Sequence, residues 1–104
     1  MSKQRRIEFH ELLCNVLGTR YAYFQPPESI KMKYPCIVYA KSSGRPTYAD
    51  NNIYTFKQGY DVTVIDPDPD SSIPKSLMET FSYIQHDREY IADNLHHSTF
   101  TIYY

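Results

Sequence analysis

The residues from Gly59 to Phe81 constrain the fold of this chain of 104 residues more than any other stretch. Within it, Tyr60 to Asp66 is an alternating run rich in β-branched residues, with the period of two expected for a strand that has one face in a core. The sequence Asp-Pro-Asp-Pro-Asp then ends the strand, because each proline lacks an N–H and fixes φ. Beyond it, a pair of serines can cap a helix in which Pro74 is tolerated in the first turn. The apolar residues at helical spacing in this region are Leu77, Met78, Phe81 and Ile84. The stretch predicts one unit of strand, rigid acidic turn and short helix.

The N-terminal residues predict the longest helix of the chain. Ser2 to Leu17 place their apolar side chains on a broad stripe, with the polar ones mostly opposite. Ser2 can cap the start, and Gly18 can adopt the left-handed conformation that ends a helix. A stripe of this width must pack on another element, most simply on one face of a sheet.

Two segments in the first half of the chain are predicted to form strands. Thr19 to Phe24 carries three aromatic residues and predicts a short strand that ends before two prolines. Tyr34 to Ala40 predicts a second strand, in which Cys36, Val38 and Ala40 face the same way.

The C-terminal third predicts a closing hairpin. Ile84 to Ile91 and Ser98 to Tyr104 have strand character, and Ala92-Asp93-Asn94 between them is a turn-forming cluster. All these elements together predict an α+β fold, with a mostly antiparallel or mixed β-sheet and with the N-terminal helix and a second short helix packed on one face. We expect one domain over residues 1–104, without internal repeats.

A long polar connection lies between the early strands and the central one. Lys41 to Asn52 has neither helical nor strand periodicity, so it predicts a long exposed loop or a two-strand excursion. Ile53 to Phe56 can start the strand that Gly59 then interrupts, as a bulge would. A loop of about a dozen residues is longer than usual in so small a domain, and such loops are often functional. It is therefore the first candidate for contact with a partner.

The composition excludes several classes of protein. Eleven Lys and Arg against 12 Asp and Glu give a formal net charge of −1, whereas proteins that bind nucleic acid usually present a basic face. Eleven tyrosines suit interfaces as well as core edges. Cys14 and Cys36 have no metal or redox spacing, and we expect buried thiols in a reducing cytosol. No apolar run is long enough to span a bilayer, and no apolar leader precedes the first helix, so a soluble protein is expected.

The spacing of the aspartates and histidines can be compared with that of known metal-binding patterns. Asp66, Asp68 and Asp70 alternate like the first ligands of a calcium loop, but the sixth position holds Ser71 instead of Gly and the twelfth holds Leu77 instead of Glu. The pair His96-His97 would point to opposite faces of a strand and does not readily share one ion. We therefore expect no metal site.

A nuclease is the alternative from the enzyme class. It would recruit Asp66, Asp87 and Glu89 to hold Mg²⁺, with Lys75 beside a phosphate. This constellation has low specificity, since acidic residues are common. The chain has no nucleophile elbow, phosphate-binding glycine loop or zinc spacing. We therefore predict no catalytic residues and no cofactor, and a protein that is not an enzyme.

Several segments together resemble one family, the tail terminator or tail-completion proteins in the neck of long-tailed bacteriophages. The resemblance spans Tyr34 to Tyr104. Its most specific features are Tyr34-Pro35 leading a strand, the run VTVID followed by Pro-Asp and by Ile73-Pro74, and Tyr90 with ADNL before an aromatic last strand. The doubled DPDPD and the histidine pair are departures peculiar to this chain.

The resemblance implies a structural virion protein of the neck. In that family a ring of subunits, usually a hexamer, caps the tube of major tail protein, ends tail polymerisation and offers a docking surface to the head-completion or connector protein. DNA passes through the ring without specific binding, no membrane is involved, and assembly takes place in the host cytoplasm. A head-completion or stopper protein on the portal side is the nearest alternative.

The resemblance also suggests where partners would touch. The long loop often reaches towards the tube in that family. Independently of the resemblance, the opposite charges of Asp87, Arg88, Glu89 and Asp93 in or beside the closing hairpin can pair across subunits or across strands, or form a solvated outer face. The candidate interface residues are Arg45, Tyr48, Asp50, Asn51, Asn52, Arg88 and Asp93.

Overall fold

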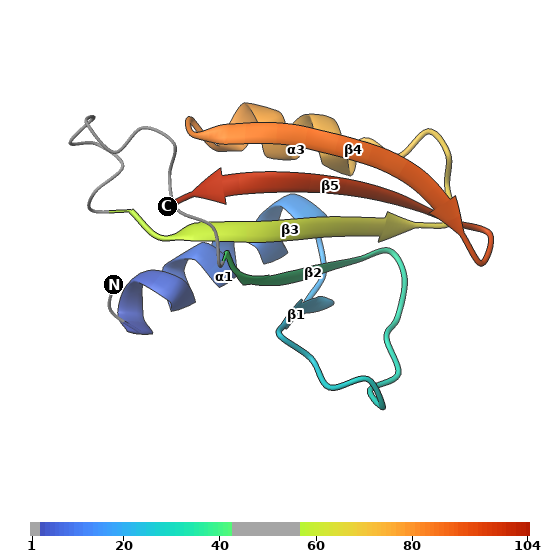
Figure 1. Cartoon of the computed structure of the whole chain (residues 1–104), viewed down its shortest axis with the longest axis horizontal. Helices are drawn as coiled ribbons and strands as arrows, with labels where there is room; N and C mark the ends of the chain where they lie inside the picture. Colours follow the sequence, from blue (N-terminus) through green and yellow to red (C-terminus); the bar gives the residue numbers. More distant parts are fainter. Residues whose placement is uncertain (1–2, 43–56) are drawn as a thin grey trace.

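A computed structural model describes residues 3–42 and 57–104 and confirms the α+β fold (Figure 1). The elements in chain order are α1 (Lys3–Leu17), β1 (Ala22–Phe24), β2 (Cys36–Lys41), β3 (Gly59–Asp66), α3 (Ile73–Thr80), β4 (Ile84–Ala92) and β5 (Leu95–Tyr103). The five strands form one sheet in the order β1-β2-β3-β5-β4. β1 pairs with β2 in parallel, and the other pairings are antiparallel. The sheet is therefore mixed, and the predicted central strand lies in the middle of it.

Both helices pack on the same face of the sheet, as predicted. In Figure 1, α1 lies behind β2 and β3, and α3 lies behind β4. α1 buries one face, which carries Phe9, Leu13 and Leu17. It ends where expected, because Gly18 has φ 83° and its N–H donates to the Cys14 carbonyl at 2.8 Å.

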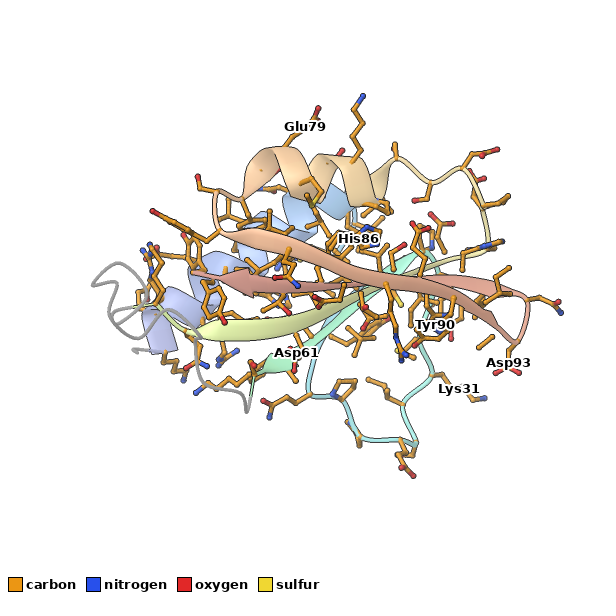
Figure 2. The ribbon with its side chains drawn as sticks, turned by 45° about the horizontal axis from the view of Figure 1, so that its top comes forward. Lys31, Asp61, Glu79, His86, Tyr90 and Asp93 are labelled. Atoms are coloured by element: carbon orange, nitrogen blue, oxygen red, sulfur yellow. The ribbon has the colours of Figure 1, made fainter. Side chains whose placement is uncertain are left out.

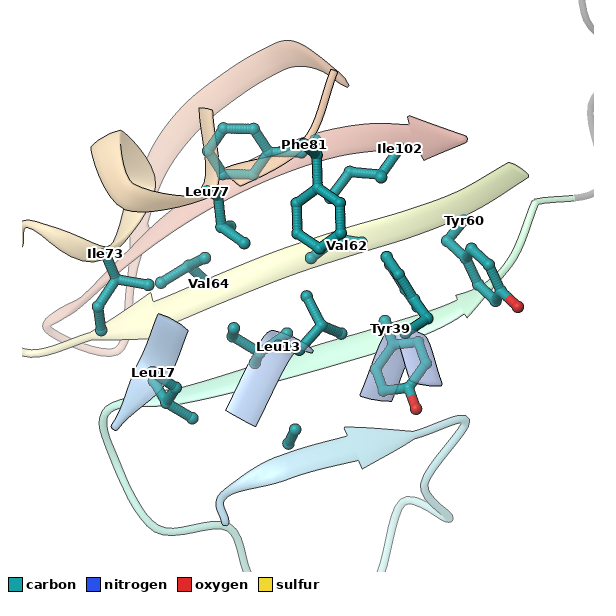
Figure 3. Packing of buried hydrophobic residues seen from close by; sticks show 14 of the residues in the cluster. Leu13, Leu17, Tyr39, Tyr60, Val62, Val64, Ile73, Leu77, Phe81 and Ile102 are labelled. Carbon is teal, nitrogen blue, oxygen red and sulfur yellow. The ribbon is translucent and has the colours of Figure 1, made fainter. Parts of the chain in front are cut away.

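The core lies between the helices and this face. On β3 the alternate residues Tyr60, Val62 and Val64 are buried beneath the helices (Figure 3). Phe9 of α1 stacks on Tyr60 with ring centroids 4.3 Å apart and meets Tyr39 edge-on at 5.5 Å. Aromatic packing therefore holds α1 to the two central strands.

The strand Cys36–Lys41 is buried on both faces at its start. Ile37 and Tyr39 point into the core under the helices, while Cys36 is buried on the opposite face. Burial raises the pKa of the Cys36 thiol to about 11, so this thiol is protonated at neutral pH. Cys14 is also a buried free thiol, as predicted.

The short helix is shorter than its apolar spacing predicts. α3 ends at Thr80, and Phe81 is already extended with φ −107° and ψ 135°. Ile84 belongs to β4, so including it in the helical series was wrong. Met78, another member of the series, is 45% exposed. Helical spacing continued by chance into a strand that packs on the same core.

Ser72 is the N-cap residue of α3, and the side-chain bond at this end comes from Ser71 before it. Ser71 Oγ accepts a hydrogen bond from the Ile73 N–H at 3.3 Å, whereas Ser72 makes no capping bond through its side chain. Pro74 occupies the first turn, where its missing N–H costs nothing. The predicted cap Ser2 of α1 lies outside the described residues.

A histidine at the core edge makes stability dependent on pH. His10 Nδ1 lies 2.6 Å from the buried Tyr39 hydroxyl. Burial, and then the nearby Arg20, hold the pKa of His10 below its ordinary value of 6.5. The unfolded chain therefore binds this proton at a higher pH than the folded chain does, so stability should be complete above about pH 6.5 and fall as the pH drops below it.

Chemical denaturation at a series of pH values between about 5 and 7.5 measures this effect. His10→Gln should flatten the fall in the denaturation midpoint. An equal slope in the wild type and in His10→Gln would contradict the assignment.

Candidate functional site

A cleft of about 590 Å³ lies between the start of α3 and the part of the β4–β5 hairpin nearest its turn. The cleft exists because α3 is shorter than β4. The eight residues of α3 span about 12 Å, whereas the nine residues of β4 span about 30 Å. The helix therefore covers only part of the hairpin. The lining residues are Val64, Asp66, Asp68, Pro69, Ser71, Pro74, Lys75, Glu89, Tyr90, Ile91, His96, His97 and Ser98.

The acidic turn forms one wall of the cleft. The Asp68 N–H donates to Asp66 Oδ1 at 2.9 Å, and the Asp70 N–H donates to Asp68 Oδ1 at 2.9 Å. Two successive turns of this kind, with prolines between them, fix the backbone of the wall. Asp66 is only 8% exposed, while Asp68 is exposed.

The hairpin forms the opposite wall. Ser98 Oγ donates to Glu89 Oε1 at 3.5 Å, and His86 Nε2 lies 3.8 Å from the same oxygen. Ile91 is 67% exposed at the lip of the cleft. Sequence reasoning did not single out Ile91, because strand alternation does not tell which apolar residue of an edge strand is left uncovered.

The residues of the nuclease alternative are only partly brought together. Asp66, Lys75 and Glu89 line the cleft, but Asp87 does not. Asp87 Oδ2 accepts from the Thr101 hydroxyl at 2.8 Å and Oδ1 accepts from the Gln85 amide at 3.1 Å. Over residues 3–42 and 57–104 no group of three or more His, Cys, Asp or Glu has the geometry of a metal site. The arrangement therefore supplies charge and shape for contact, without a metal centre in the described part.

Arg88 lies on the exposed edge strand. Its guanidinium sits 4.9 Å from the centre of the Tyr90 ring, and Tyr90 stacks on His97 at 4.7 Å with an interplanar angle of 12°. A bulge between His86 and Arg88 interrupts the ladder with β5. A row of stacked side chains, from Arg88 through Tyr90 to His97, therefore runs across the hairpin.

Asp93 lies at the tip of the hairpin (Figure 2). Asp93 and Asn94 have φ 53° and 63°, which is the conformation of a two-residue type I′ turn. The predicted turn is therefore present. Of the predicted interface residues, Arg88 and Asp93 are thus on one hairpin, and Arg45, Tyr48, Asp50, Asn51 and Asn52 lie outside the described residues.

Substitutions at Asp93 separate its backbone role from any contact role. Asp93→Val should lower the free energy of unfolding by about 1–2 kcal/mol, because a β-branched residue is strained at positive φ. Asp93→Asn keeps a side chain that tolerates this conformation and removes the charge, so stability should be unchanged. Urea denaturation measures both, and equal stability of the two variants would contradict the turn assignment.

Comparisons with family models, with curated proteins and with solved structures gave no match for this chain. Within the described part, no helix is long and apolar enough to cross a membrane.

Proposed function

We propose that the chain is a structural subunit of a phage neck, which forms a ring on the end of the tail tube, stops its polymerisation and presents a surface for head docking. The resemblance of Tyr34 to Tyr104 to tail terminator proteins motivates the proposal. Such a subunit needs two different complementary patches, because a ring is built from contacts between unlike surfaces.

The observation that carries the proposal is the one-sided cover of the sheet. The helices cover only one face. On the opposite face Cys36 and Ile65 are buried, while the alternate residues Thr63, Thr99 and Thr101 lie half-buried on neighbouring strands. Every residue of the edge strand β4 after Ile84 is exposed. A half-exposed sheet face and an exposed edge strand are two unlike surfaces on one small subunit, available for contact with neighbouring proteins.

The edge of β4 favours contact through side chains over sheet extension. Asp87, Arg88 and Glu89 stand in the middle of the strand, beside the bulge. Bulges and charges at such positions oppose the pairing of a further strand. The formal net charge of −1 also suits a ring through which DNA passes without being held.

Light scattering of the purified chain, alone and with purified tail tubes, tests the proposal, with electron microscopy to locate the chain. We expect rings on tube ends and tubes that no longer elongate. A chain that ignores tubes but binds a portal assembly would be a head-completion or stopper protein, and the proposal would be wrong.

The nuclease alternative is tested by a different measurement. It predicts Mg²⁺ or Mn²⁺ binding and cleavage of nucleic acid that is lost in Asp66→Ala. A nuclease assay with either ion, run on the wild type and this variant, decides it. Metal-dependent cleavage that disappears in the variant would replace the structural proposal.

A further inference from the structure

We infer that the cleft beside the acidic turn receives the opposite, basic end of a second copy of this chain. The inference rests on the proposed function, because it assigns the contact between neighbouring subunits of the ring. It starts from the charges of the cleft. Three carboxylates, on Asp66, Asp68 and Glu89, face the single ammonium of Lys75, so the cleft carries a formal charge of −2 with its histidines neutral (1 − 3).

The cleft also has an apolar part. Val64, Pro69 and Pro74 line it beside the carboxylates, and Ile91 stands exposed at its lip. Exposed apolar surface next to fixed carboxylates suits long basic side chains, whose methylene stems pack on apolar groups while the charged heads meet the acids. A volume of about 590 Å³ holds several such side chains.

The end of the molecule opposite the cleft carries such basic side chains. The start of α1, the end of β2 and the start of β3 lie at the end of the molecule where the C-terminus lies (Figure 1), and five cationic residues lie in or next to these segments. Arg5 lies over the Tyr104 ring, the Tyr104 N–H donates to the Gln58 carbonyl beside Lys57, and Lys41 pairs with Tyr60 at the start of β3. Lys3 and Arg6 lie in the first turns of α1. This basic end contains Lys3, Arg5, Arg6, Lys41 and Lys57, against the nearby acids Glu8 and Asp61.

The two charged regions do not neutralise each other within one chain. The molecule is 41 Å long, and the basic end and the cleft lie towards opposite ends of that axis (Figure 1). At physiological salt the Debye length is about 8 Å, so their attraction within one chain is screened. Between two chains the regions can come into contact. Head-to-tail repetition of this contact gives a ring if the rotation closes.

Charge reversal tests the inference. The cleft variant combines Asp68→Lys with Glu89→Lys, and the basic-end variant combines Lys3→Glu with Lys41→Glu; all four side chains are exposed. Glu28→Lys with Glu79→Lys makes the same change in charge away from the cleft and serves as the control. Circular dichroism confirms that each variant is folded before its mass is measured by light scattering without tail tubes.

The wild type should associate, and raising the salt from about 20 mM to about 500 mM should weaken association at least tenfold. Each charge-reversed variant alone should associate at least about tenfold more weakly than the wild type, because like charges then face each other. The control should remain within about threefold. An equimolar mixture of the two variants should recover association, because the cleft of each variant then faces a basic-end region of opposite charge on the other variant.

Three results would overturn the inference: a wild type that is monomeric at low salt up to its solubility limit, folded variants that associate like the wild type, or a mixture that recovers no association. Failure of the proposed function looks different. If the wild type associates and the mixture recovers association, but no chain binds tail tubes, the contact stands and the tail role does not. If tubes are capped equally well by the wild type and the cleft variant, the tail role stands and the contact does not.

Discussion

Phe9→Ala is expected to lower the free energy of unfolding by about 3–5 kcal/mol, as for other large aromatic residues removed from a core. Phe9 is fully buried, and its ring contacts those of Tyr39, Tyr60, Phe81 and Tyr104. The truncation removes the aromatic residue of α1 around which these four rings pack. A domain of this size is stable by only about 5–15 kcal/mol, so the variant should be close to unfolding at room temperature.

Urea denaturation followed by circular dichroism measures this loss, with Met78→Ala as the matched control. Met78 is a large apolar residue on the other helix but is 45% exposed, so its truncation should change stability by no more than about 0.5 kcal/mol. Equal losses for the two variants would mean that α1 does not pack on the sheet as described.

Val62→Asp should have an effect at least as large, about 3–5 kcal/mol or more, because it places an unpaired carboxylate in the centre of the core. Val62 is fully buried on the central strand and faces the helices. Burial would raise the pKa of the new carboxyl above its unfolded value of about 3.9. The unfolded chain then loses this proton first as the pH rises, so the variant should regain part of its stability in acid.

The control for this variant is Ile91→Asp, the same kind of change at an apolar residue that is 67% exposed. Its stability should match that of the wild type within about 0.5 kcal/mol. Thermal unfolding at neutral and acid pH compares the two variants. A stable Val62→Asp protein would contradict the assignment of this face of β3 to the core.

The closing hairpin shows how far local patterns reach. The turn residues of Ala92-Asp93-Asn94 predicted the hairpin, and the structure adds that Asp93 and Asn94 adopt positive φ. The short helix shows where local sequence patterns mislead. Its apolar spacing continued through Ile84, but that residue is in β4. Periodicity reports which residues are buried on one side, and a helix and the following strand can bury residues on the same core.

The sequence predicted less of the candidate site than of the fold. Asp66, Lys75 and Glu89 were considered together only as metal and phosphate ligands, while the cleft that they line results from the short reach of α3 along the hairpin. Of the candidate interface residues, Arg88 and Asp93 are on this hairpin. The interface role of these two residues and of the loop residues remains a prediction.

The sequence by itself determined the helices, the strands, the acidic turn that ends β3 and the one-sided packing of an α+β domain. These depend on neighbouring residues, through proline, turn chemistry and periodicity. Only the tertiary structure decided the strand order β1-β2-β3-β5-β4, the parallel pairing of β1, the burial of both faces of β2 and the cleft between α3 and the hairpin. Each of these depends on pairing and packing between residues far apart in the chain, which local patterns do not encode.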